Sequence, residues 1–177
     1  MVSKTIKCDK RANVLLAAIV VLCDDPSQFC DVKIHVGQRT FKCHKLILAL
    51  QSNFFKERFL RGPQQSTIFH FTLRHVVPED FQNVLRYLYT GEVEFDSNTV
   101  GRNLRLAKLV QLDDVVNMCV RFMVDTLDVE TCVQYWQAAR DIGNSSLEVR
   151  CLELFLKRFV CVTMTSRLED KIGRAHV

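Results

Sequence analysis

The chain has 177 residues, of which 48% are hydrophobic and 25% charged, with 6 Gly and 3 Pro. This length and balance predict one sizeable core and exclude a disordered, collagen-like or low-complexity protein. Residues 1–11 and 150–177 each carry a net charge of +3, whereas residues 12–149 carry −2. Because nucleic-acid surfaces need basic residues clustered on the folded body, we expect no nucleic-acid partner.

The first predicted element is a helix over residues 9–25, which Pro26 ends. Its run from Val14 to Cys23 is apolar on nearly all faces, so this helix needs burial on more than one side. Basic residues precede the run, as in a secretory signal peptide, and a secreted binding protein is therefore one alternative. The run is too short to span a bilayer, and acidic residues follow it where signal cleavage requires small ones. We favour a helix buried in an interface and expect no membrane partner.

The next segments alternate polar and apolar residues, which is typical of strands. Strands are predicted over residues 31–36 and 40–43, as a hairpin, and over residues 67–73. Helices are predicted over residues 45–50, from Ser52 through Phe59, from Pro78 to Gly91, and over residues 99–110 and 113–127. Beyond residue 128 the pattern stays helical, with a linker at residues 143–146. This order predicts an α+β fold, a small sheet flanked by helices, followed by an all-helical extension.

The cysteines, histidines and glycines do not occur in the patterns typical of catalytic, metal or phosphate-binding sites. The eight cysteines stand singly, without the paired spacing of a zinc site. Most have apolar neighbours, which predicts reduced core thiols of an intracellular protein. His44, His70 and His75 lie in or beside apolar elements, and the glycines form no phosphate-binding cluster. We therefore expect no enzymatic activity, no catalytic residue, no metal site and no cofactor.

Four motifs together resemble the BTB/POZ domain. They are Phe29-Cys30-Asp31-Val32, the run from Phe41 to Ala49, Ser52-Asn53-Phe54-Phe55, and Tyr87-Leu88-Tyr89-Thr90-Gly91. They occur in the order and spacing of the family, and the resemblance places a BTB/POZ domain at residues 12–127. Residues 129–171 resemble the start of the helical BACK domain, which follows BTB in kelch-like proteins.

The resemblance implies a homodimerising adaptor without catalytic activity. In the family the first helix packs against its symmetry mate, which would supply the second burial surface that this helix needs. The resemblance implies a dimer interface at Val14, Leu15, Ala18, Ile19 and Leu22, with Asp31 and Lys45 as a charged pair in the groove beside it. His44 corresponds to a structural histidine of the family.

The resemblance further implies a substrate-recruiting subunit of a cullin-RING ubiquitin ligase, in the cytoplasm or the nucleus. Family members that bind the cullin carry a hydrophobic-x-Glu motif that ends six residues after a helical phenylalanine. Counted from Phe59, those positions hold Pro63, Gln64 and Gln65. Proline has no amide donor and glutamine has no charge, so we expect cullin binding to be weakened.

The alternative implied by the same family is a BTB-type transcription regulator whose dimer groove binds corepressors. It predicts zinc fingers downstream, whereas residues 132–159 resemble BACK. The last six residues, 172–177, can be encoded by a stretch that resembles a common sequencing-library adapter. We therefore expect a truncated chain with a non-native tail at residues 172–177, and the ubiquitination substrate is not identified.

Overall fold

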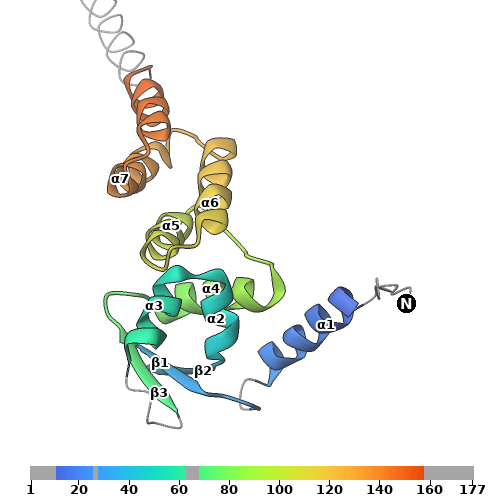
Figure 1. Cartoon of the computed structure of the whole chain (residues 1–177). Helices are drawn as coiled ribbons and strands as arrows, with labels where there is room; N and C mark the ends of the chain where they lie inside the picture. The colour runs from blue at the N-terminus through green and yellow to red at the C-terminus, as the bar shows by residue number, and fades with distance from the viewer. Residues whose placement is uncertain (1–10, 26–27, 63–67, 158–177) are drawn as a thin grey trace, which may run out of the picture. The chain divides into compact units, whose positions relative to one another are not determined.

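The structure is a computed structural model that describes residues 11–25, 28–62 and 68–157 (Figure 1). It divides into two compact units, residues 1–94 and residues 95–177. The helices of the first unit are α1 (Arg11–Asp24), α2 (Lys45–Gln51), α3 (Asn53–Arg61) and α4 (Pro78–Thr90). Its strands are β1 (Val32–Val36), β2 (Arg39–Cys43) and β3 (Phe69–Leu73). The small sheet with helices confirms the predicted α+β class.

The three strands form one sheet in the order β2-β1-β3. The strands β1 and β2 pair antiparallel as the predicted hairpin, and Gly37 in its turn adopts φ +56°. The third strand pairs parallel with β1, so that Ile34 lies between Phe41 and Phe71 across the sheet. The third strand was predicted over residues 67–73. Residue 67 lies outside the described residues, and pairing with β1 begins at Phe69.

One face of the sheet is buried and the other faces solvent. Along β1 and β3 every second side chain is buried, and these are Val32, Ile34, Val36, Phe69, Phe71 and Leu73. Figure 1 shows α2, α3 and α4 on one side of the strands. Strand alternation therefore places the apolar residues beneath these helices and the polar residues on the opposite face.

Local capping explains where the helices of this unit begin and end. The predicted N-cap Ser52 accepts a hydrogen bond from the Phe55 amide at 3.2 Å, which starts α3. Pro78 opens α4, with Glu79 and Asp80 in its first turn, where the helix dipole favours carboxylates. Gly91 ends α4 in the left-handed conformation with φ +77°.

The second unit is helical, and it contains the helices that were predicted from residue 99 onward. It contains α5 (Val100–Leu109), α6 (Asp113–Asp125), α7 (Cys132–Ile142) and helical residues 145–157. The helix α5 packs against both α6 and α7. The fully buried side chains Leu104, Val115, Met123 and Tyr135 form its core. Whether residues 129–171 form a BACK domain stays a prediction, and residues 158–177, with the proposed tail, lie outside the described residues.

An aspartate before each of two of these helices accepts hydrogen bonds from the residues that follow it. Before α5, the Asp96 carboxylate accepts hydrogen bonds from the Thr99 hydroxyl at 2.6 Å and from the amides of Asn98 and Thr99. Before α7, the Asp128 carboxylate accepts from the amide of Thr131 at 2.7 Å and from its hydroxyl at 2.8 Å. These bonds stabilise the charged form, so the pKa of each carboxyl is lowered.

Five cysteines are described as free thiols. Cys43, Cys119, Cys132 and Cys151 are buried and Cys30 is half-buried. Burial raises the pKa of Cys119 to about 12, because an apolar environment disfavours the thiolate. These thiols pack as small core residues, in agreement with the sequence prediction.

Candidate interaction surfaces

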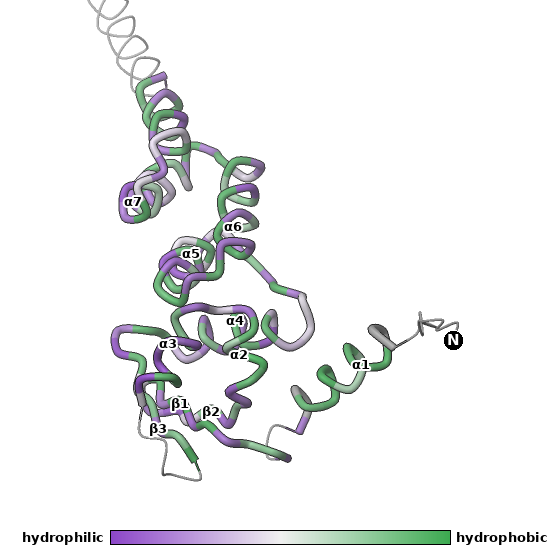
Figure 2. Tube along the Cα trace, viewed as in Figure 1, coloured by the Kyte–Doolittle hydropathy of each residue, from purple (hydrophilic) through white to green (hydrophobic). Residues whose placement is uncertain are grey.

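The helix α1 is apolar but largely uncovered. Figure 2 shows hydrophobic residues along most of its length. Val14 is 65% exposed and Leu16 is 60% exposed, and the large apolar side chains of Leu15, Val20 and Val21 are exposed as well. Monomeric soluble proteins rarely leave contiguous apolar surface of this kind in water. This surface, which we call the α1 surface, is the first candidate for a partner contact.

The predicted interface residues divide into two groups on α1. Val14, Leu15 and Ala18 are exposed, whereas Ile19 and Leu22 are half-buried. The helix contacts α4 within its own unit, and the two half-buried residues are three positions apart, on one side of the helix. Leu16, Val20 and Val21 are exposed apolar residues that the sequence prediction did not include. Which side of α1 is exposed depends on its contact with α4, and the sequence alone does not show that contact.

A second exposed apolar group lies on α2. Leu46 is 69% exposed and Leu50 is 73% exposed, whereas Ile47 and Leu48 between them are buried. Leu46 and Leu50 are four residues apart and therefore share one side of the helix. The sequence run Lys45 to Leu50 is continuously apolar after its lysine, so it could not show which of its leucines face solvent.

Asp31 and Lys45, the predicted charged pair, are in contact, but the contact is between the Asp31 side chain and the Lys45 backbone. The Asp31 carboxylate accepts a hydrogen bond from the Lys45 backbone amide at 2.7 Å, at the start of α2. The Lys45 ammonium lies over the Phe69 ring, 5.5 Å from its centroid. Within the described residues there is no ion pair between the two side chains. Asp31 therefore acts on the first turn of α2 rather than on the Lys45 side chain.

His44 is buried in a hydrogen-bonded network. Its Nε2 lies 2.6 Å from the Gln28 carbonyl, and its Nδ1 lies 2.6 Å from the Tyr89 hydroxyl. Because a carbonyl can only accept, Nε2 carries the hydrogen in the neutral ring, and the Tyr89 hydroxyl donates to Nδ1. The same hydroxyl accepts from the His44 backbone amide at 3.2 Å. This network ties the start of α2 to α4, which is the structural role expected for His44.

The predicted cullin-binding residues lie at the end of α3 and beyond it. Phe59 is half-buried, with its ring edge-on to Phe69 at 5.5 Å and stacked on Phe55 at 6.0 Å between centroids. The next residue, Leu60, is 65% exposed and was not predicted. Pro63, Gln64 and Gln65 lie outside the described residues. The structure therefore places only the phenylalanine of this motif, and it places it against the aromatic core.

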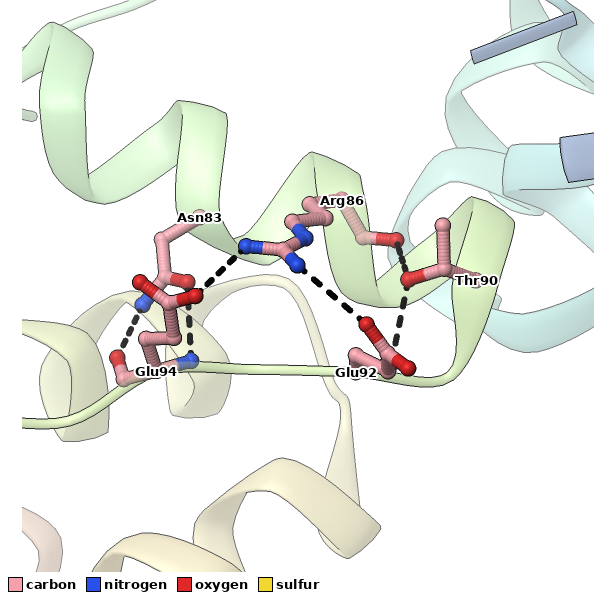
Figure 3. Close-up of polar contacts among 5 residues, drawn as sticks. All are labelled: Asn83, Arg86, Thr90, Glu92 and Glu94. Carbon is pink, nitrogen blue, oxygen red and sulfur yellow. Dashed lines mark hydrogen bonds and ion pairs between the residues drawn. The ribbon is translucent and has the colours of Figure 1, made fainter. Parts of the chain in front are cut away.

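Side chains of α4 hold the loop that follows the last of the four motifs (Figure 3). Arg86 of α4 bonds Glu94 at 2.7 Å and Glu92 at 3.2 Å, and these bonds raise the pKa of the Arg86 guanidinium. The Asn83 amide donates to the Glu94 carbonyl at 2.6 Å and accepts from the Glu94 backbone amide at 3.1 Å. The Thr90 hydroxyl accepts from the Glu92 amide at 3.1 Å. The side chains of α4 thus fix the position of residues 92–94.

Metal binding and membrane insertion have no candidate site among the described residues. Among these residues no group of three or more His, Cys, Asp or Glu side chains is arranged to hold a metal ion. None of the described helices has both the length and the apolarity to span a membrane. Three surfaces of the described residues are candidates for binding: the α1 surface, the exposed leucines of α2, and the end of α3.

Curated relatives of this chain are kelch-type proteins. Human Kelch-like protein 40 is 30% identical over 149 residues, which are 84% of this chain and 23% of that protein. Human Kelch repeat and BTB domain-containing protein 2 is 31% identical over 134 residues, which are 76% of this chain and 22% of that protein. Zebrafish (Danio rerio) Kelch repeat and BTB domain-containing protein 8 is 29% identical over 139 residues. The chain spans about a quarter of the length of these relatives.

Solved structures with the same fold are BTB domains. The BTB domain of zebrafish PATZ1 matches with a TM-score of 0.62 at 23% identity, over 70% of this chain and 100% of that one. The BTB domain of human Gigaxonin matches with a TM-score of 0.59 at 21% identity, over 69% of this chain and 98% of that one. The model of the BTB/POZ domain family matches residues 22–127. The chain therefore belongs to the BTB/POZ domain family, as its four motifs predicted.

Proposed function

We propose that this chain is a homodimerising adaptor that recruits substrates to a cullin-RING ubiquitin ligase. The observation that carries the proposal is the α1 surface, a helix with an apolar face that its own unit does not cover. Kelch-type relatives support the assignment to an adaptor, and the helical residues 132–142 and 145–157 favour this class over the corepressor-binding regulator. The proposed location is the cytoplasm or the nucleus, where the free thiols of the core remain reduced.

The energetics of the α1 surface favour a dimer. Burial of apolar surface contributes about 25 cal/mol per Å², so covering five large side chains on each protomer contributes several kcal/mol per protomer. Leu46 and Leu50 of α2 extend the apolar area available to a second copy. Association has its own entropic cost, which a surface of this size on both partners can exceed. We therefore expect dimers at micromolar concentration.

The dimer is tested by light scattering after size-exclusion chromatography. Leu16→Asp places a charge on the exposed side of α1, where a dimer would bury it, and it should give a monomer with unchanged circular dichroism. Leu16 is preferable to Ile19 because Ile19 is half-buried within its own protomer. The matched control is Leu109→Asp, the same change at an exposed leucine of α5, which should remain dimeric. A monomeric unmodified protein at micromolar concentration would contradict the proposal.

Cullin binding is the finer part of the proposal. The expected motif positions hold Pro63, Gln64 and Gln65 instead of a hydrophobic-x-Glu sequence. Losing one charge-assisted contact costs about 1–3 kcal/mol, which corresponds to about 5- to 100-fold in affinity. We expect weak binding that the double substitution Pro63→Met and Gln65→Glu strengthens.

Titration calorimetry with the N-terminal domain of a cullin measures this effect. Gln38→Glu adds the same charge at an exposed position in the hairpin turn and serves as the control, with no expected change in affinity. Nanomolar affinity of the unmodified chain, without a gain from the double substitution, would show that residues 63–65 do not determine cullin binding. Because dimerisation is measured separately, either part of the proposal can fail alone.

A further inference from the structure

We infer that the solvent-facing side of the sheet binds an acidic polypeptide segment of a partner protein. We call this side the outer face. On β1 and β3 its side chains alternate with buried ones, and on β2 they are the register partners of the β1 residues. They are Lys33 and His35 of β1, Thr40 and Lys42 of β2, and His70 and Thr72 of β3. All six are polar, and each can donate a hydrogen bond.

The strand register arranges these residues in two rows. Lys33 lies opposite Lys42 on one side and opposite His70 on the other, which makes a row of three donors across the sheet. His35 lies between Thr40 and Thr72 in the same way and makes the second row. Two rows of cationic and hydroxyl groups on adjacent positions form a single surface that favours anions.

The lysine pair is unfavourable for the isolated fold. Two like charges directly opposite each other on neighbouring strands destabilise a sheet. The sequences of the three strands contain no Asp or Glu, and neither lysine forms an ion pair with another described residue. Two carboxylates near the strands are already engaged, Asp31 with the Lys45 amide and Glu79 with Arg39. A ligand carboxylate between the two lysines would remove this repulsion.

The two histidines extend the donor row. His35 Nε2 lies 3.1 Å from His70 Nδ1, and the ring centroids are 5.4 Å apart with planes at 16°. A centroid separation this much longer than the N to N distance requires the rings to meet edge to edge, so a single hydrogen is shared between the two nitrogens. His35 Nδ1 bonds the Thr40 hydroxyl at 2.9 Å. When Thr40 donates to His35 and His35 donates to His70, His70 Nε2 carries a hydrogen that can be donated to a ligand.

The spacing of these groups fits an extended acidic peptide. Neighbouring strands are about 4.8 Å apart, so the midpoint of the lysine pair is about 7 Å from His70 across the sheet. Side chains on the same side of an extended peptide are also about 7 Å apart. A segment with carboxylates at alternate positions can therefore place one between Lys33 and Lys42 and the next at His70. The face is too small for the many phosphate contacts of nucleic-acid binding, and residues 12–149 are net acidic.

Fluorescence anisotropy with the full chain tests this inference. The probe is a labelled eight-residue peptide of alternating Asp and Ser, compared with one of alternating Asn and Ser. We expect the acidic peptide to bind and the neutral peptide not to bind. Lys33→Gln with Lys42→Gln should weaken binding of the acidic peptide about fivefold or more, and His70→Gln should weaken it about twofold.

The matched control is Lys56→Gln with Lys108→Gln, which removes the same charge from exposed lysines of α3 and α5 and should leave the affinity within about twofold. The outer-face double variant should fold, and its melting temperature should rise by about 1–2 °C because a repulsive pair is removed. Equal binding of both peptides, or equal losses in both double variants, would overturn the inference. Tighter binding of a single-stranded oligonucleotide, lost in the outer-face variant, would overturn the choice of a peptide.

Discussion

The helices α1 and α4 belong to the same unit, yet they are stabilised in different ways. The helix α4 begins at Pro78, carries carboxylates in its first turn, ends at Gly91 and buries its apolar side, with Phe81, Val84 and Leu88 in the core. The helix α1 has no acidic residue in its first turn and no basic residue in its last, and most of its apolar residues face solvent. The comparison shows that α4 is specified by its own chain, whereas the described part of the unit leaves the apolar side chains of α1 largely uncovered.

The largest expected difference between these helices is in their response to a buried charge. Val84 of α4 is fully buried, so Val84→Asp should prevent folding, whereas Leu16→Asp on α1 should change only association. Circular dichroism and soluble yield measure folding, and light scattering measures association. Val84→Ala, which should lower stability by about 1–3 kcal/mol, keeps the comparison measurable if the aspartate variant is insoluble. A folded Val84→Asp variant would show that α4 is not the core helix described above.

The next effect concerns the buried hydrogen bonds of α4. Tyr89→Phe removes the hydroxyl that bonds both the ring and the backbone amide of His44. Leaving buried polar groups without partners costs about 1–3 kcal/mol, so the melting temperature should fall by several degrees. Differential scanning calorimetry measures the change. An unchanged melting temperature would mean that water replaces the hydroxyl, which burial of both residues argues against.

A smaller effect is expected at the end of α4. Asn83→Ala removes two hydrogen bonds to the backbone of Glu94 and should cost about 1 kcal/mol. Arg86→Gln removes only exposed ion pairs and should change stability less, with a difference that vanishes in high salt. Chemical denaturation at low and high salt separates the two. If Arg86→Gln lowers the free energy of unfolding more than Asn83→Ala does, the ion pairs of Arg86 contribute more to stability than the hydrogen bonds of Asn83, which contradicts this prediction.

The smallest effect is a pH dependence in the second unit. The pKa values of Asp96 and Asp128 are lowered in the folded protein, so each carboxylate stabilises the fold above its unfolded pKa, near 4. This contribution is lost as the pH falls through the lowered folded pKa. Asp96→Asn with Asp128→Asn should therefore make stability fall less steeply below pH 4. Equal slopes for the variant and the unmodified protein would show that these loops do not contribute.

The sequence determined the elements of this protein and their order, because its signals are local. Ser52, Pro78 and Gly91 set helix boundaries through their own backbone and side-chain bonds, and alternation along Val32 to Val36 set the inner face of a strand. The family followed from motifs in a fixed order, and the model of the BTB/POZ domain family, which matches residues 22–127, agrees with them.

Only the tertiary structure decided which apolar and charged residues are free to bind. Leu46 and Leu48 have the same local sequence environment, but the position of the sheet and helices buries one and exposes the other. Asp31 and Lys45 were predicted as a charged pair, but a backbone amide competes for the carboxylate. The outer face could not be seen in sequence, because Lys33, Lys42 and His70 become neighbours only through strand register. Exposure and register depend on contacts between distant segments, which local patterns do not contain.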